Sequence, residues 1–157
     1  MKFLFADCMD YVDPRFNFLT DQFGENREPY WDDQFPHEIL EHAPYDGVLI
    51  SRAMVGEPSH PGKYGEALSM RFRRIGAREH LRLTKPEHLD MPIFGDNGAF
   101  SYVNLPEPPY SAADTVEFYG NGQFTHGCSV DHIVFEFDPT VKGLSGGSSE
   151  SKKRFEI

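Results

Sequence analysis

Four short apolar runs, separated by segments of helical periodicity, constrain the fold of this 157-residue chain more than any other feature. Short continuous apolar runs bounded by turn residues are typical of buried strands. The glycines and prolines of residues 51–62 predict a long loop after the second run. The expected strands are Lys2–Ala6, Tyr45–Ile50, Met91–Phe94 and His132–Phe137.

Helices are expected between these strands. Asp32–Glu41 has acids in its first turn and apolar side chains at helical spacing. Tyr64–Ile75 forms an imperfect helix that carries arginines, and Ser111 caps a helix through Tyr119, with Asp114 in the capping-box position. Strands that alternate with helices predict an α/β fold with a parallel sheet.

Acidic side chains follow three of the four expected strands. Asp7, Asp96 and Asp138 stand at strand ends, and Ser51-Arg52 follows the remaining strand. The carboxyl ends of parallel strands meet at one edge of the sheet, where such folds place their chemistry. We therefore expect a functional rim at this edge.

Asp96 is the strongest candidate on this rim. It lies in Gly95-Asp96-Asn97-Gly98, where glycines leave room for a ligand to approach closely. A carboxylate at a strand end can act as general acid or base, as nucleophile, or as acceptor for the N–H edge of a purine-like ring. Phe100 is placed to stack on a flat ring. The competing interpretation is an ordinary turn, because Asn-Gly is a common turn dipeptide.

The net charge of −10 is unevenly distributed. Residues 50–86 carry 8 basic and 3 acidic side chains, whereas residues 1–49 carry 3 basic and 11 acidic ones. A basic stripe on an acidic body suits a local grip on a phosphate backbone, and a solvated helix face is the competing interpretation. The arginines predicted to contact a nucleic-acid backbone are Arg71, Arg73, Arg74 and Arg78.

Neither a disulfide nor a metal site is expected. Cys8 and Cys128 are too few and too far apart for a disulfide scaffold, and Cys128 is expected before the fourth strand, on the face opposite Cys8. One group has loosely metal-like spacing but enters that strand from its amino end: His126, Cys128 and His132. A second group lacks the glycine pattern of a calcium loop and reads as a solvated loop: Asp7, Asp10 and Asp13.

The distribution of apolar residues predicts a cytoplasmic protein with no membrane partner. No stretch approaches the roughly 18 apolar residues of a membrane helix. The first apolar run is too short for a signal peptide and meets Asp7 at once.

Two motifs resemble those of a known family. Asp96-Asn97-Gly98-Ala99-Phe100 resembles the Asp-Ser-Gly-Gly-(Phe/Tyr) motif of tRNA-guanine transglycosylases, and Ser129–Asp138 resembles their Gly-Ser-Asp-Ile segment, whose strand ends in Phe-Asp. The motifs have the family's order and a similar separation, and the resemblance covers most of residues 1–140. The opening segment Phe5–Pro14 resembles the branch that inserts 7-deazaguanine bases into DNA.

The resemblance implies a base-binding set of Asp96, Gly98, Phe100 and Asp138. Asp96 matches the aspartate that acts as acid and base on the exchanged base, and Phe100 matches the aromatic that stacks on it. Asp138 matches the aspartate that recognises the base's hydrogen-bonding edge. Departures from the family pattern leave the exact base open; these are Asn97 for Ser, Ala99 for Gly, Ser101 for Gln, and Pro139 after Asp138.

The implied fold is the N-terminal part of a (β/α)8 barrel of the TIM type over residues 1–140. A polar flexible segment and the start of a further helix follow over residues 141–157. A complete barrel needs about 250 residues. The family's nucleophilic aspartate and its zinc site, Cys-x-Cys-x-x-Cys plus His, lie in the second half, so neither they nor any other cofactor is expected here.

The implied activity is a pentosyl transfer that replaces guanine in nucleic acid with a 7-deazaguanine such as preQ0. The resemblance to the DNA-modifying branch favours DNA as the substrate, and tRNA stays open as the alternative. This chain alone is expected to be inactive and to need the remainder of the barrel, for example from another chain. A non-catalytic nucleic-acid-binding protein on a degenerate half barrel is the main alternative. A metal-dependent hydrolase would want His-x-His after the first strand, where Asp7-Cys8-Met9 stands.

Overall fold

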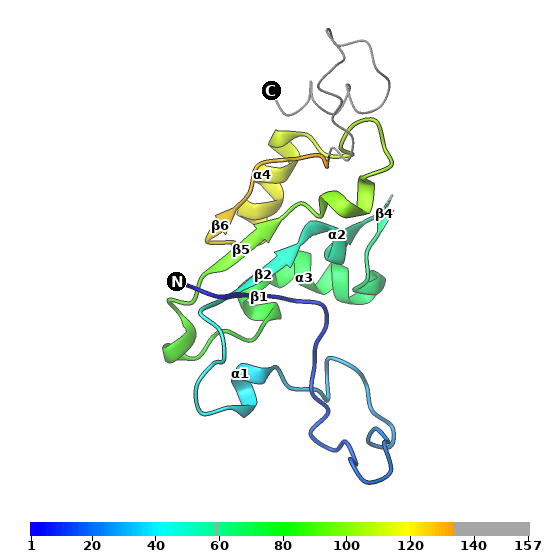
Figure 1. Ribbon diagram of the computed structural model, residues 1–157, viewed down its shortest axis with the longest axis vertical. Coiled ribbons are helices and arrows are strands. Elements are labelled where there is room, and N and C mark those ends of the chain that lie inside the picture. The colour runs from blue at the N-terminus through cyan, green and yellow to red at the C-terminus, as the bar shows by residue number, and fades with distance from the viewer. Residues whose placement is uncertain (59, 134–157) are drawn as a thin grey trace, which may run out of the picture.

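The computed structural model of the chain describes residues 1–58 and 60–133 and is built on a four-stranded sheet (Figure 1). The strands run in the order β1 (Leu4–Ala6), β2 (Gly47–Ser51), β5 (Ile93–Asp96) and β6 (His126–Gly127). Every neighbouring pair in this sheet is parallel. The predicted α/β class with a parallel sheet is therefore confirmed.

The register of the central strands sets the rim. Val48 pairs with Ile93 and Ser51 with Asp96, so β2 and β5 end at the same level. Val48, Ile50 and Ile93 are buried in a core that helical residues complete, whereas Leu49 and Phe94 on the other side of the strands are half-buried. Buried strand residues are expected in a parallel sheet whose faces are covered.

Helices and short turns fill the connections. The helices are α1 (Pro36–Ile39), α2 (Arg52–Val55), α3 (Gly65–His80) and α4 (Ala112–Asn121), and the 3-10 turns are η1 (Pro86–His88) and η2 (Ala99–Tyr102). A small antiparallel pair, β3 (Gly56–Glu57) with β4 (His60–Pro61), lies in the segment predicted to be a loop. Helices α3 and α4 are neighbours, because the Phe72 and Phe118 rings stack with centroids 6.1 Å apart.

The predicted cap of α4 is confirmed. The Ser111 hydroxyl accepts from the Asp114 backbone N–H at 3.1 Å, and the Asp114 carboxylate accepts from the Ser111 N–H at 3.0 Å. This reciprocal pair satisfies two N–H groups that an uncapped helix end leaves open.

Helix α3 is interrupted near its end. Gly76 has φ 79° and ψ 169°, which is not helical. The next residue, Ala77, donates its N–H to the carbonyl of Gly122 at 2.8 Å. The interruption therefore joins α3 to the end of α4.

The bounds of one predicted strand and one predicted helix need correction. The fourth strand of the sheet is β6, six residues before the predicted start at His132; residues 132 and 133 belong to no strand, and residues 134–137 lie outside the described residues. The helix predicted over Asp32–Glu41 is reduced to α1, because the side chains of Asp32 and Asp33 bond to the preceding turn.

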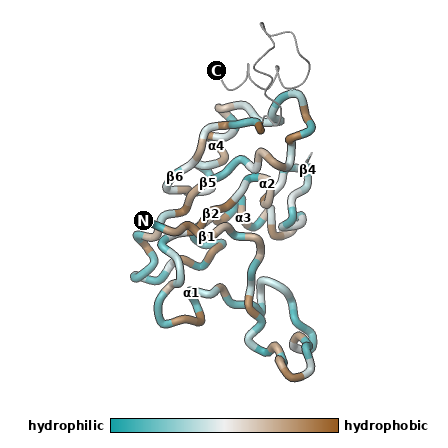
Figure 2. Tube along the Cα trace, in the orientation of Figure 1, coloured by the Kyte–Doolittle hydropathy of each residue, from teal (hydrophilic) through white to brown (hydrophobic). Residues whose placement is uncertain are grey.

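Residues 8–35, called here the N-terminal excursion, project from the carboxyl end of β1 (Figure 1). Tyr30 and Phe35 anchor the excursion in the core. Its far end is apolar and exposed (Figure 2), with Phe18 and Leu19 almost fully accessible. In the described ranges, no helix combines the length and the apolar character needed to cross a membrane.

Candidate active site

Asp96 ends β5 at the carboxyl edge of the sheet, as predicted. Its Oδ2 accepts from the backbone N–H of Gly98 at 2.8 Å. Its Oδ1 lies 3.8 Å from the Cys128 sulfur, which is within reach of a weak S–H donor. The carboxylate is half-buried, so it is oriented by the protein and still accessible from outside.

Gly98 makes this arrangement possible. Its φ of 74° lies in the left-handed region that favours glycine. A Cβ atom at this position would overlap the side chain of Ala53 and lie 2.5 Å from the hydroxyl oxygen of Ser51. The backbone therefore passes so close to the end of β2 that only glycine fits without displacement.

Asn97 is not the solvated residue of an ordinary turn. Its side chain is fully buried and donates from Nδ2 to the carbonyl of Ser129 at 2.6 Å. The Asn97 amide thereby holds the segment after β6 against the end of β5. Its Oδ1 has no hydrogen-bond partner in the described part of the chain.

Phe100 lies on the exposed side of η2, together with Ser101. Its accessibility is 77%, whereas Ala99 and Tyr102 are buried. The Tyr102 hydroxyl donates to the carbonyl of Asp131 at 3.1 Å and so ties η2 to the segment after β6. A rigid turn thus presents one aromatic face to solvent, a short distance along the chain from Asp96.

Comparison with known proteins finds a relative that matches the whole chain. No protein-family model matches the chain. Over 159 aligned residues, which cover the whole chain, it is 38% identical to a DNA-guanine transglycosylase of Salmonella montevideo. Along its whole length the chain is therefore similar to a guanine transglycosylase. It spans 37% of the length of that curated relative.

This similarity confirms the resemblance drawn from the two motifs. Of the base-binding set, the structure places Asp96, Gly98 and Phe100 together at the end of β5. Asp138 lies outside the described residues, as does the boundary predicted at residue 140. The roles of all four residues stay predictions.

Asp7 occupies the same edge of the sheet, at the end of β1. Its N–H donates to the carbonyl of Leu49, and its buried carboxyl group accepts from the Tyr64 hydroxyl at 2.6 Å. Burial raises the pKa of Asp7, and the bond from Tyr64 acts in the opposite direction. Asp7 therefore lies on the predicted rim, with one carboxylate oxygen engaged by Tyr64.

A cavity of about 420 Å³ lies beside η2. Its lining includes Ser101, the residue after Phe100. Its wall includes Ser101, Tyr102 and Tyr110, whereas Asp96 and Phe100 do not line it. Arg52 holds this wall in place, with its guanidinium 3.8 Å from the centre of the Tyr110 ring. The cavity is thus a neighbour of the candidate site rather than the site itself.

The predicted backbone-binding arginines differ in their surroundings. Arg78 donates to the carbonyls of His88 and Met91 at 2.9 and 3.0 Å, which ties α3 to the loop before β5. Arg73 pairs with Glu57 at 3.1 Å, and Arg71 lies over the Trp31 ring at 4.9 Å. Arg74 is exposed. Their contacts to nucleic acid stay a prediction.

Cys128 is the residue that the sequence placed wrongly. Because β6 lies at residues 126–127, Cys128 follows a strand instead of preceding one, and it lies at the same edge as Cys8 and Asp96. Cys8 is exposed and Cys128 is half-buried, and neither forms a disulfide within the described residues. Within the described ranges, no group of three or more His, Cys, Asp or Glu side chains is arranged to hold a metal ion.

Proposed function

We propose that the chain forms part of a (β/α)8 barrel that exchanges guanine in DNA for a 7-deazaguanine such as preQ0. Two findings support this proposal. The four strands of the sheet are parallel, and each one pairs with the strand of this sheet that follows it along the chain. Consecutive strands of a (β/α)8 barrel are arranged in the same way. The curated relative is named for guanine transglycosylation in DNA. The proposed chemistry uses carboxylates and needs no redox cofactor, and we propose that it takes place in the cytoplasm.

The observation that carries the proposal is the pairing of a held carboxylate with an exposed ring. The Gly98 N–H orients Asp96, and Phe100 offers an accessible face four residues later. A flat base stacked on Phe100 would present its ring nitrogens to the Asp96 carboxylate. Asp138 would then recognise the hydrogen-bonding edge of the base.

The proposed reaction is a double displacement at C1′ of the nucleotide. A carboxylate nucleophile forms a bond to C1′ while the bond from C1′ to the guanine nitrogen breaks, and Asp96 gives a proton to the leaving base. The incoming base then returns a proton to Asp96, attacks C1′ and expels the carboxylate. By the family resemblance the nucleophile belongs to a later strand, so we propose that further barrel strands, from a longer polypeptide or a second chain, complete the site.

The test of the base site is guanine and preQ0 binding to the 157-residue chain, measured by isothermal titration calorimetry. We expect Asp96→Asn to weaken binding at least about tenfold, because the charged acceptor is lost. The exposed Asp90 supplies a matched control, since Asp90→Asn makes the same chemical change away from the site. Equal affinities of the wild-type chain and Asp96→Asn would contradict the proposed role of Asp96.

The test of the reaction is incorporation of labelled preQ0 into DNA and, separately, into tRNA. We expect no incorporation by the 157-residue chain alone and incorporation into DNA once the further barrel strands are supplied. Incorporation by the chain alone would contradict the proposed division of the site. Incorporation into tRNA only would contradict the proposed substrate.

A further inference from the structure

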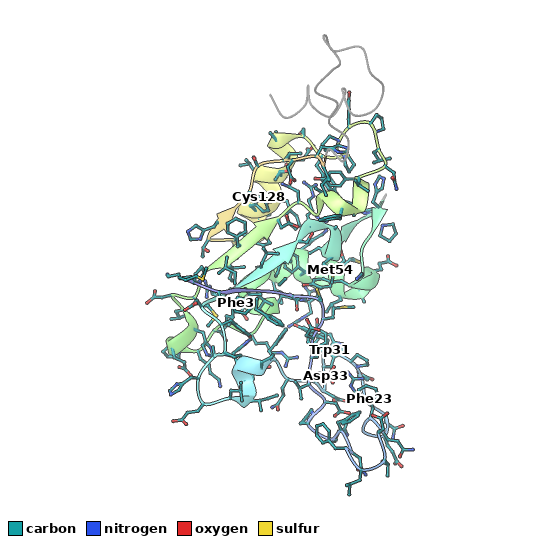
Figure 3. The ribbon with its side chains drawn as sticks, viewed as in Figure 1. Phe3, Phe23, Trp31, Asp33, Met54 and Cys128 are labelled. Atoms are coloured by element: carbon teal, nitrogen blue, oxygen red, sulfur yellow. The ribbon has the colours of Figure 1, made fainter. Side chains whose placement is uncertain are left out.

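Cys128 lies at the centre of a polar cluster that the proposed chemistry does not yet use. The residue follows β6, and its N–H donates to the carbonyl of Gly95 at 3.0 Å. Its sulfur lies 3.8 Å from the Asp96 Oδ1, 3.4 Å from the Asn97 Nδ2 and 3.7 Å from the Tyr119 hydroxyl oxygen. Figure 3 labels Cys128 between the sheet and α4.

The chemistry of the neighbours assigns a direction to the thiol hydrogen. An amide Nδ2 can only donate, so Asn97 donates to the sulfur. Burial raises the pKa of Tyr119, so its hydroxyl keeps a proton that it can also donate to the sulfur. Among these three neighbours, Asp96 in its ionised form is the one that has no hydrogen to give. The S–H group therefore points to the Asp96 carboxylate.

Tyr119 and two glycines fix the position of this thiol. A Cβ atom at either Gly95 or Gly127 would overlap the Tyr119 ring, so the ring lies directly against the backbone of two adjacent strands. Close packing of this kind leaves little freedom for the phenol or for the sulfur beside it. The thiol is therefore held in place from α4, from β5 and from β6, which Cys128 follows.

We propose that Cys128 is a positioning residue for Asp96, an inference that rests on the proposed base exchange. The Gly98 N–H binds one carboxylate oxygen and the Cys128 thiol binds the other, so rotation of the carboxylate is restricted from both sides. The restriction holds the carboxylate ready to accept a proton from a base and to return it. A donor at position 128 is required, and a purely apolar side chain does not replace it.

The first test measures the contact itself and needs no activity. In a Cys8→Ser background, Cys128 is the only thiol, and its alkylation by iodoacetamide is followed by mass spectrometry. Asp96→Asn removes the carboxylate that the thiol contacts, so it is expected to speed alkylation about threefold or more. Asp90→Asn is expected to leave the rate unchanged. Equal rates in all three proteins would overturn the contact.

The second test measures the consequence for the base. We expect Cys128→Ala to weaken guanine binding about tenfold, and Cys128→Ser, which keeps a donor, to recover to within about threefold of the wild-type affinity. Urea unfolding of both variants shows whether they are folded equally well. Wild-type affinity in a folded Cys128→Ala protein would overturn the positioning role.

The two tests separate the inference from the function on which it rests. Guanine protection of Cys128 from alkylation would support both. If the wild-type chain binds no guanine while Asp96→Asn still speeds alkylation, the proposed function fails and the contact between Cys128 and Asp96 stands. If guanine binds normally but neither the alkylation rate nor the Cys128→Ala affinity changes, the positioning role fails alone.

Discussion

The rim around β5 and the N-terminal excursion both carry aspartates and exposed aromatic rings, yet they use their carboxylates in opposite ways. In the excursion, Asp33 accepts two bonds from Arg27, at 2.6 and 2.8 Å, and one from the Tyr30 N–H. Asp13 accepts backbone N–H groups of Arg15 and Gly24. The acceptor sites of these carboxylates are therefore occupied by donors of the excursion itself.

Asp96 differs because its bonding capacity is only partly used. A carboxylate offers about four acceptor sites, and among the described residues Asp96 uses one for a backbone N–H and one for a weak thiol donor. By contrast, the acceptor sites of Asp33 are occupied. Burial acts to raise the pKa of Asp33, but the bonds from Arg27 and Tyr30 outweigh burial and hold this pKa below its ordinary value. Spare acceptor sites therefore distinguish a candidate functional aspartate from a structural one.

The largest expected effect tests the close packing of the rim. Gly98→Ala should lower the free energy of unfolding by about 3 kcal/mol, because left-handed strain and an overlap with Ala53 add together. Gly65→Ala is the matched control, since Gly65 has φ 71° and no atom within 4 Å of a built Cβ. It should cost only about 1 kcal/mol. Equal losses in urea unfolding would contradict the special packing at Gly98.

The second prediction compares the two kinds of aspartate directly. Asp33→Asn should cost about 2 kcal/mol, because the largely buried guanidinium of Arg27 loses its partner at 2.6 Å and keeps only the more distant Asp13, at 3.9 Å. Asp96→Asn should cost at most about 1 kcal/mol, since an amide oxygen can still accept from Gly98. Urea unfolding of both variants measures the difference. A larger loss for Asp96→Asn would reverse the distinction drawn between the two regions.

The third prediction concerns the junction between the regions. His80 is fully buried, with its ring stacked between those of Tyr30 and Tyr64, and burial lowers its pKa to about 3. Below its ordinary pKa near 6.5 the unfolded chain binds a proton that the folded chain does not, so stability falls as the pH drops from about 6.5 towards 3. The expected loss from His80 at pH 5.5, relative to pH 7.5, is about 1 kcal/mol.

Urea unfolding at the two pH values checks this contribution. His80→Phe should remove it while keeping a ring in the stack. The pH dependence that remains should come largely from His37, whose pKa burial lowers to about 4. The exposed His42 provides the control, because His42→Gln should keep the wild-type pH dependence. An unchanged pH dependence in His80→Phe would contradict the role of His80.

The smallest expected change in stability concerns one exposed aromatic ring in each region, Phe100 and Phe18. Phe100→Leu and Phe18→Leu should each change the free energy of unfolding by less than about 0.5 kcal/mol, since both rings are exposed. Guanine affinity should fall about fivefold for Phe100→Leu, through the loss of about 1 kcal/mol of stacking, and should stay unchanged for Phe18→Leu. Equal affinities in calorimetry would remove Phe100 from the site.

The sequence predicted the parts of the fold that local chemistry determines. The apolar run of β2, the Ser111 cap and the position of Asp96 after a strand all follow from the identity of neighbouring residues. The capture of Asp33 by Arg27 was not predictable, because it depends on a turn that brings them together. That bond also explains why the helix begins only at Pro36.

The strand β6 shows the limit of such reasoning at the site itself. Its two residues, His126 and Gly127, have no apolar character, and their pairing depends on Thr125, which bonds to the backbone of Ile93. The β-branched residues at 133 and 134 predict a strand more strongly than this pair does. Missing the short strand moved Cys128 to the wrong end of the sheet and concealed its contact with Asp96.

The interruption at Gly76 has a consequence for how the arginines of α3 should be grouped. Side chains keep a fixed angular spacing around the helix axis only while the backbone dihedrals stay helical. The dihedrals of Gly76 are not helical, so the angular spacing that relates Arg71, Arg73 and Arg74 does not extend to Arg78. What reads as a single charged row in the sequence is two independent rows in space. Charge substitutions in α3 should therefore be combined within residues 71–74 and made separately at residue 78.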